Sequence, residues 1–279
     1  MSGMVISTNI SSLAAQRHLA SSRADMEQAM ERLSSGKRIN SAMDDAAGLT
    51  ISHSLDGKIA GLNQAVRNAN DGISLVNLAE GALEEVTTML VRMKELATQA
   101  MNGTYTATDR DALDAEYQAL EAGIDSIANY TQWNGLEVLD GSSSSVTFQV
   151  GDSSGDSITL TLQDMNVAAI GTASGTQVSG TDLQDTTKAA AALTVLDDAI
   201  AEVDSFRSTL GATANRLEHS ASNLMSRVEH QSAARSRIQD ADYAVESANL
   251  AKAQVLQQAG TAMLAQANAS TSNVVSLLR

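Results

Sequence analysis

The sequence predicts a mainly α protein, a long antiparallel coiled-coil helical bundle with a small β-hairpin at its distal end. Apolar residues recur every three or four positions over long stretches, which is the period of packed helices. The chain contains no proline, a residue that would interrupt such helices. Aromatic residues make up 3% of the chain against 43% hydrophobic residues, so most apolar side chains are of the aliphatic kind that fills narrow seams between helices.

Three runs carry the helical repeat. The first comprises Val76, Ala79, Leu83, Val86, Leu90, Met93, Ala97 and Ala100. The second comprises Leu193, Leu196, Ile200, Val203, Leu210, Ala214, Leu217, Ala221, Leu224 and Val228, with Arg207 as its main exception. The third is shorter and comprises Leu113, Tyr117, Leu120, Ile124 and Ile127. Sustained repeats indicate coiled-coil packing, whereas independent amphipathic helices, the alternative, would not need to hold one phase over so many turns.

The stretches between these runs contain helix ends, and after the third run the period of the sequence changes from helical to alternating. We expect Asn102 and Gly103 to end the first long helix and Thr108 to cap the next one. Apolar and polar residues then alternate on both sides of a Gly- and Asp-rich turn, which predicts a β-hairpin near 146–162. Residues 171–187 are rich in Gly, Ser, Thr and Asp, which is typical of a surface loop.

Charge divides the chain into three segments. Residues 1–46 and 236–279 each hold equal numbers of acidic and basic side chains, so the whole net charge of −15 falls between them. A neutral surface packs readily against copies of itself, while an acidic surface stays solvated. We therefore expect residues 1–46 and 236–279 to form one helical domain and residues 47–235, with the hairpin, to form another. Nucleic acid is not an expected partner at this charge.

Both ends also carry helical stripes, but weaker ones. Their stripes are rich in Ala, Ser and Gln, so each helix is marginal alone and needs partners to offset its ordering entropy. Our hypothesis is that both ends are disordered in the free monomer and become helical in an assembly. An out-and-back chain path brings these ends together and takes the hairpin far away.

No pattern of catalysis, metal binding or cofactor binding is present. The chain has no cysteine and no metalloprotease, nucleophile-elbow or phosphate-loop motif, and its four histidines are scattered. We therefore expect no enzyme activity and no cofactor. No apolar run approaches the roughly 18 residues that a membrane span needs, so no membrane partner is expected. The start of the chain lacks a secretory signal, so secretion would have to use a route without a cleaved leader.

Several motifs resemble those of bacterial flagellins. Residues 31–48 (ERLSSGKRINSAMDDAAG) and 67–74 (RNANDGIS) resemble the N-terminal signature of that family. Residues 234–243 (ARSRIQDADY), 257–261 (QQAGT) and 264–268 (LAQAN) resemble its C-terminal signature. The match covers both terminal thirds in the right order. Only a short loop separates the hairpin from Lys188, so the resemblance is to a short form that lacks the variable outer domains.

This resemblance implies a structural subunit of the bacterial flagellar filament, the propeller for swimming motility. Such subunits leave the cell through the flagellar type III export channel and assemble outside it into a helical homopolymer. The terminal segments would form the inner tube and residues 47–235 the outer tube. The implied partners are other copies of the chain, an export chaperone, the filament cap and hook-junction proteins.

The resemblance also assigns roles to residues. The implied inner-tube assembly residues are Ile6, Ile10, Leu13, Leu250, Leu256, Met263, Leu264, Leu277 and Leu278. The implied spoke between the two tubes, where small shifts would switch the supercoil, contains Ser35, Gly36, Arg38, Asn40, Asp44 and Asp45. A patch read by vertebrate toll-like receptors corresponds to Arg92, Leu96, Gln99 and Glu116, which would alternatively serve only as subunit contacts. Independently of the resemblance, the serine run 142–145 makes Ser143 and Ser144 candidates for O-linked sugar, and a plain solvated loop is the alternative.

Three other functions remain open at this point. A hook–filament junction protein shares the terminal features but usually matches these motifs less completely. An enzyme or adhesin displayed on a filament would need a pocket or a large central insertion, and neither is visible. A cytosolic coiled-coil adaptor would not need the family motifs.

Overall fold

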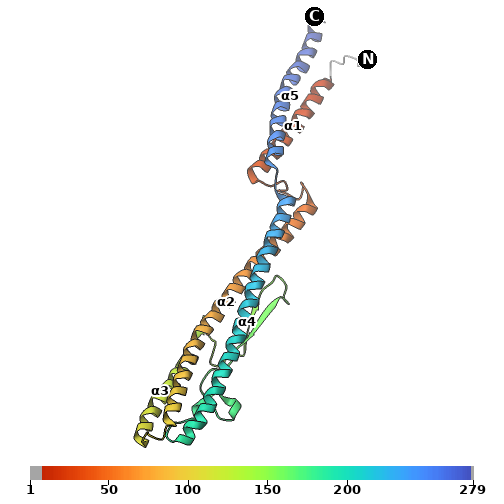
Figure 1. Cartoon of the computed structure of the whole chain (residues 1–279). Helices are drawn as coiled ribbons and strands as arrows, with labels where there is room; N and C mark the ends of the chain where they lie inside the picture. The colour runs from red at the N-terminus through yellow and green to blue at the C-terminus, as the bar shows by residue number, and fades with distance from the viewer. Residues whose placement is uncertain (1–7, 278–279) are drawn as a thin grey trace. The chain divides into compact units, whose positions relative to one another are not determined.

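A computed structural model of the protein describes residues 8–277, without the side chains of residues 174 and 271–277. It confirms the mainly α fold with small antiparallel hairpins (Figure 1). The helices are α1 (Ile10–Ser35), α2 (Ala46–Ala100), α3 (Ala107–Tyr130), α4 (Thr186–Gln239) and α5 (Tyr243–Leu277). The strands are β1 (Gln132–Trp133), β2 (Leu136–Glu137), β3 (Ser145–Gln149) and β4 (Ser157–Thr161). None of the described helices combines the length and apolar character that crossing a membrane requires.

Each of these helices begins at a side chain that accepts a backbone N–H of the first turn. These residues are Asn9, Asp45, Thr106, Asp185 and Asp242. Such acceptors satisfy amide groups that have no partner inside the helix. Thr106, not the expected Thr108, caps α3, because it forms a capping box with Asp109. Short polar side chains therefore set the start of each of these five α-helices.

The chain divides into two compact units. Unit 1 consists of residues 1–59 and 230–279, and unit 2 consists of residues 60–229. Within unit 1, α1 and α5 lie side by side (Figure 1). Within unit 2, residues of α2, α3 and α4 pack around a continuous aliphatic core. Both long helices, α2 and α4, contribute residues to each unit.

The seam of unit 2 follows the predicted repeats. All eight residues of the first run are buried, as are Leu196, Val203, Leu210, Leu217, Ala221 and Leu224 of the second. Phe206 is also buried, and its spacing from Val203 and Leu210 continues the repeat without Arg207. Arg207 lies beside the seam, where its Nε and Nη2 are 2.9 and 2.7 Å from Glu80 Oε1 on α2. The apparent exception is thus an interhelical ion pair.

The hairpin β3–β4 is confirmed, with Val146 opposite Leu160 and Phe148 opposite Ile158. Its apolar face is buried against the helices, since Phe148, Ile158 and Leu160 all belong to the core. The outward face carries threonines, of which Thr147 and Thr159 lie opposite each other. This arrangement matches the alternating pattern of the sequence.

The expected distal position of this hairpin is wrong. Asn68 Nδ2 on α2 donates to Gln149 O at 3.0 Å, and Asp152 in the turn accepts from Arg227 Nη2 at 3.3 Å. These contacts lie toward the residue-60 end of unit 2 and away from Ala100. The reason is the length of α3, whose 24 residues carry the chain back antiparallel to α2 before the hairpin begins. The hairpin therefore covers the side of the bundle.

Residues 163–185, called the strap here, connect the hairpin to α4. The strap contains two short 3₁₀ turns, Thr172–Ser174 and Val178–Gly180, and within it the described residues form no α-helix or β-strand. It is more firmly attached than a plain surface loop, because Met165, Ile170, Val178 and Leu183 are buried in the core of unit 2. The prediction of a surface loop over residues 171–187 is thus only partly right. Residues 186–187 belong to α4, and Val178 and Leu183 are buried, because the tertiary packing draws them into the core.

Candidate functional site

The paired helices of unit 1 are held in register by polar contacts. Asn9 Nδ2 on the first turn of α1 donates to Ala267 O at 3.0 Å, and its Oδ1 also accepts from Ser12 N. Ser12 Oγ lies 3.0 Å from Asn268 Oδ1. One asparagine therefore caps α1 and links it to α5, so the start of one helix fixes its position along the other.

Large apolar side chains remain exposed on this pair. Ile10 and Leu13 on α1 are 69% and 52% exposed, and Leu256 and Met263 on α5 are 46% and 64% exposed. Of these, Leu256 and Met263 line a groove between α1 and α5, together with small and polar residues such as Ala14, Gly260 and Asp25. Leu250 and Leu264 are half-buried. Several large apolar side chains exposed on one helix pair favour a protein–protein contact there.

Three of the predicted assembly residues lie at the edge of the described chain. Ile6 and Leu278 lie outside the described residues. Leu277 is the last residue of α5, and its side chain is not described. The six other assembly residues lie on α1 or α5 and belong to the same helix pair.

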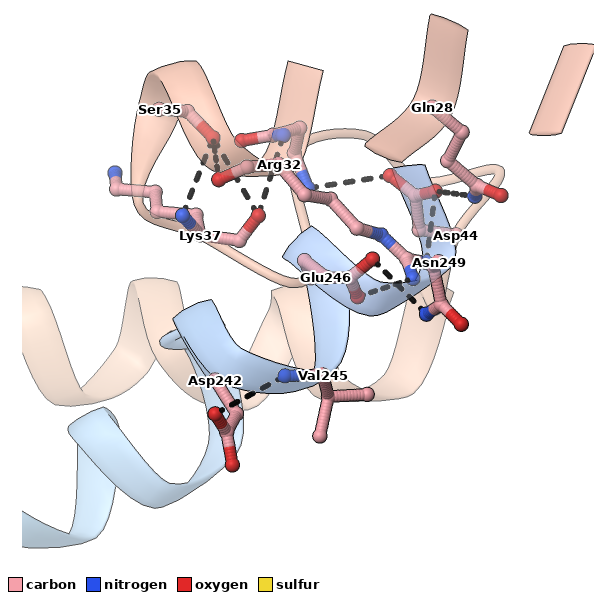
Figure 2. A network of polar contacts seen from close by, with 10 residues as sticks. Gln28, Arg32, Ser35, Lys37, Asp44, Asp242, Val245, Glu246 and Asn249 are labelled. Atoms are coloured by element: carbon pink, nitrogen blue, oxygen red, sulfur yellow. Dashed lines mark hydrogen bonds and ion pairs between the residues drawn. The ribbon is translucent and has the colours of Figure 1, made fainter. Parts of the chain in front are cut away.

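An ion-pair network joins α1, α5 and the loop after α1 (Figure 2). Arg32 Nη1 lies 3.1 Å from Glu246 Oε1, and Arg32 Nη2 lies 3.8 Å from Asp44 Oδ1. Gln28 Nε2 donates to Asp44 Oδ1 at 2.9 Å, and Asn249 Nδ2 donates to Glu246 Oε2 at 3.3 Å. Glu246 is buried, and these partners satisfy its two carboxylate oxygens. The network lines a polar hollow of about 280 Å³ between the two helices.

The predicted spoke residues form a loop that is tied to the C-terminal part of the same chain. Gly36 ends α1 in the left-handed conformation (φ 70°), which glycine adopts without a Cβ penalty. Its carbonyl accepts from Ala241 N at 3.0 Å, and Arg38 N donates to Gln239 O at 2.6 Å. Arg38 Nη2 also donates to Ile238 O. Ser35 is exposed and bonds within the loop through its hydroxyl.

Asp44 and Asp45 organise the second half of this loop. Asp44 Oδ2 accepts from Asn40 N at 3.2 Å and from Ser41 N at 3.0 Å. The hydrogen bond from the Ser41 N–H, followed by those from Gln28 and Asn40, lowers the pKa of the Asp44 carboxyl. Asp45 caps α2 through Gly48 N, where an added Cβ would meet the Asp45 side chain. The two acidic residues are thus a turn former and a helix cap.

The predicted receptor patch is only partly a surface. Arg92 Nη2 lies 2.8 Å from Glu116 Oε1, and Gln99 Nε2 donates to Tyr105 OH at 2.8 Å; Arg92, Gln99 and Glu116 are exposed, and Tyr105 is half-buried. Leu96 is wrong as a patch residue, because it is fully buried. Its spacing from Met93 and Ala100 places it on the core face of α2. The hydrogen bonds of Arg92 with Glu116 and then Glu95 raise its pKa further.

The candidate glycosylation residues lie just before β3. Ser144 is exposed, and its carbonyl accepts from Leu162 N at 3.1 Å. Ser143 is half-buried. Of the two, Ser144 offers the more accessible hydroxyl.

Sequence reasoning did not single out Arg32 or Glu246 as site residues. Arg32 lies within the 31–48 motif, but its partner is 214 positions away. A pair of opposite charges at two otherwise neutral ends was the only available signal, and many such pairs are possible. Only the packing of α1 against α5 selects this one.

Comparisons with known proteins point in one direction. The family description "Bacterial flagellin N-terminal helical region" matches residues 6–144, and "Bacterial flagellin C-terminal helical region" matches residues 193–278. A flagellin of Halalkalibacterium halodurans is 44% identical over 99% of this chain and 100% of its own. The flagellar filament 33 kDa core protein of Treponema phagedenis is 40% identical over the same shares. The crystal structure of Bacillus cereus flagellin is 38% identical, with a TM-score of 0.50, over 57% of this chain and 88% of its own.

Proposed function

The chain belongs to the bacterial flagellin family, and on that basis we propose that α1 and α5 are the segments through which its copies polymerise. The protein is a structural, non-enzymatic subunit of the bacterial flagellar filament, exported to the cell exterior, where the filament serves motility. It assembles with copies of itself. The observation that carries the proposal is the exposed apolar surface of the α1–α5 pair.

The terminal segments and the middle segment would lie in different layers of the filament. Residues 1–46 and 236–279 would form the inner tube, and residues 47–235 the outer tube with the spoke at residues 35–45. Charge supports this division, because the terminal segments are neutral while the net charge of −15 lies between them. Neutral apolar helices tolerate close packing with copies of themselves, and an acidic layer stays solvated.

Assembly would be coupled to burial of the exposed terminal side chains. Ile10, Leu13 and Met263 are each more than half exposed in the single chain. Burying apolar surface against neighbours stabilises the assembly by roughly 25 cal/mol per Å². This gain would offset the entropy lost when the small-residue helices become ordered. The register contacts of Asn9 and Ser12 would then present one defined surface to the next subunit.

Other partners are proposed from the same surfaces. An export chaperone would cover the exposed face of α5 around Leu256 and Met263 before type III export. The filament cap and the hook-junction proteins would contact the terminal segments as a neighbouring subunit does. A vertebrate toll-like receptor would read Arg92, Gln99 and Glu116, which are exposed, without Leu96. Sugar attachment, if present, would use Ser144 before Ser143.

Seeded polymerisation tests the assembly proposal. Leu13→Asp places a charge on the exposed apolar surface, and Gln16→Asp places the same charge on an exposed polar position of α1. We expect Leu13→Asp to raise the critical concentration at least tenfold, which corresponds to about 1.4 kcal/mol per subunit. Gln16→Asp should have a much smaller effect. Filaments formed by Leu13→Asp at the concentration of the unchanged protein would contradict the proposal.

Deletion of residues 1–30 or 250–279 is the stronger test. Either deletion should abolish polymerisation, since each removes one helix of the pair. Far-ultraviolet circular dichroism checks that unit 2 stays folded, and negative-stain microscopy checks for filaments. Polymers formed without either terminal segment would be incompatible with α1 and α5 as the polymerising part.

A further inference from the structure

The strap is attached to one face of α3 by three polar contacts. Asp125 Oδ1 accepts from Val167 N at 2.9 Å, and Asp114 Oδ1 accepts from Leu183 N at 2.8 Å. Between them, Tyr117 OH lies 2.6 Å from Thr181 Oγ1 in a buried contact. Residues 114, 117, 121 and 125 recur at the three- and four-residue spacing that aligns side chains on one helical face. The polar contacts of the strap with α3 therefore come from a single row of α3 side chains.

Glu121 occupies the remaining position of this row, and it lacks the kind of contact its neighbours make. Its Oε1 is buried and has no hydrogen-bond partner among the described residues. No ion pair between Glu121 and a cation occurs within residues 8–277 either. Lys188 Nζ, in the first turn of α4, is bound to Asp182 Oδ2 at 2.7 Å. A buried carboxylate oxygen without a donor is costly when it is charged.

The neighbouring charges add to this cost. The carboxylates of Asp114 and Asp125, on α3 itself, act on Glu121. On the side of α4, Glu202 accepts hydrogen bonds from Gln163 and Gly171 of the strap, and Lys188 is paired with Asp182. Burial first, and then the charges of Asp114 and Asp125, raise the pKa of Glu121 to about 7. The protonation state of Glu121 therefore changes close to neutral pH.

We propose that Glu121 is a pH-sensitive latch of the strap. In its neutral form it lies between the three contacts without repelling Asp114 or Asp125. In its ionised form Glu121 adds a third negative charge, with no donor at Oε1 among the described residues. This charge lies between Asp114 and Asp125, the two carboxylates that accept hydrogen bonds from strap amides. The strap then opens more often from α3, and the apolar side chains beneath it, such as Val178 and Leu183, become accessible. This property belongs to unit 2 and is independent of polymerisation through α1 and α5.

The direction follows from the raised pKa. The folded chain holds the Glu121 proton more tightly than the open strap does, so neutral Glu121 stabilises the closed state. That contribution is fully present below the ordinary glutamate pKa of 4.5 and is lost as the pH rises through about 7. Closed strap is thus favoured at mildly acidic pH and weakened at mildly alkaline pH.

Amide hydrogen exchange in the full-length monomer tests the latch. Protection factors of the Val167 and Leu183 amides, corrected for the intrinsic pH dependence of exchange, are compared at about pH 5.5 and about pH 8.5. In the unchanged protein we expect protection at both amides to fall at least about tenfold over this interval. In Glu121→Gln, which keeps the shape but cannot ionise, the fall should disappear.

Asp111→Asn is the matched control. Asp111 is an exposed acidic residue on α3, so its replacement removes one negative charge from the same helix without touching the strap. This variant should keep the pH dependence of the unchanged protein. Limited proteolysis within residues 163–185 gives a second readout, with faster cleavage at the higher pH in the unchanged protein and Asp111→Asn only. Equal pH dependence with and without Glu121, or loss of it in Asp111→Asn as well, would overturn the proposal.

Discussion

Arg32 Nη1 and Glu246 Oε1 lie 3.1 Å apart and join residues separated by 214 positions of the chain. Glu246 is buried, and its other oxygen accepts from Asn249, so the arginine is its charged partner. Arg32 also faces Asp44 in the loop that follows α1. One arginine therefore links both terminal helices and the loop between α1 and α2.

Loss of the Glu246 charge should weaken the helix pair. In Glu246→Ala the guanidinium of Arg32 keeps only Asp44, and the helices lose a charged hydrogen bond that contributes about 2 kcal/mol. We expect filaments of this variant to form only at a critical concentration about tenfold or more higher. Glu31→Ala, at an exposed position of α1, is the control. Sedimentation of seeded filaments measures both, and equal critical concentrations would show that the pair is dispensable.

Replacing Gly72 and replacing Gly81 by alanine should change the free energy of unfolding in opposite directions. A Cβ at Gly72 would lie 3.0 Å from both Leu217 Cδ1 and Phe148 Cδ1, so Gly72→Ala overpacks the contact of hairpin and helices and should cost about 1–3 kcal/mol. A Cβ at Gly81 would have nothing within 4 Å, so Gly81→Ala should stabilise α2 by about 0.5–1 kcal/mol. Chemical unfolding of the monomer measures both changes. A stabilising Gly72→Ala would mean that the hairpin does not pack here.

Arg207 should stabilise the seam of unit 2 although it breaks the apolar repeat. Its contact with Glu80 is partly exposed, so we expect Arg207→Met to lower the free energy of unfolding by about 1 kcal/mol. Arg216→Met, at an exposed position of the same helix, should change stability less. A double-mutant cycle with Glu80→Gln isolates the pairwise interaction. A coupling energy of zero would show that the two side chains do not interact in solution.

The loop after α1 should loosen at acidic pH. Because the pKa of Asp44 is lowered in the folded chain, its contribution is present above the ordinary value of 3.8 and is lost as the pH falls through the lower folded value. We expect the protection of the Ser41 amide against exchange to fall over that acidic range. The dependence should be absent in Asp44→Asn and retained in Glu27→Gln, an exposed α1 residue. Its persistence in Asp44→Asn would assign it to another group.

Much of unit 2 could be predicted because helical packing is recorded locally in the sequence. The spacing of the run from Val76 to Ala100 predicts which face of the helix is buried, because residues three and four apart lie on the same side of a helix. The same rule places Leu96 in the core, whereas family resemblance placed it on a surface patch. Where resemblance and local spacing disagreed, spacing was the better guide to burial.

The sequence by itself determined the long helices, the strands of the hairpin and, through the terminal motifs, the flagellin family. The tertiary structure alone decided that the hairpin returns beside Asn68 and that Arg32 meets Glu246. It also decided that Glu121 Oε1 is buried without a donor among the described residues, in the row of α3 side chains that contacts the strap. The physical reason is the sequence separation over which each interaction acts. Periodicity and capping depend on neighbours within a few residues, while an ion pair or a buried orphan oxygen depends on which distant segments pack together.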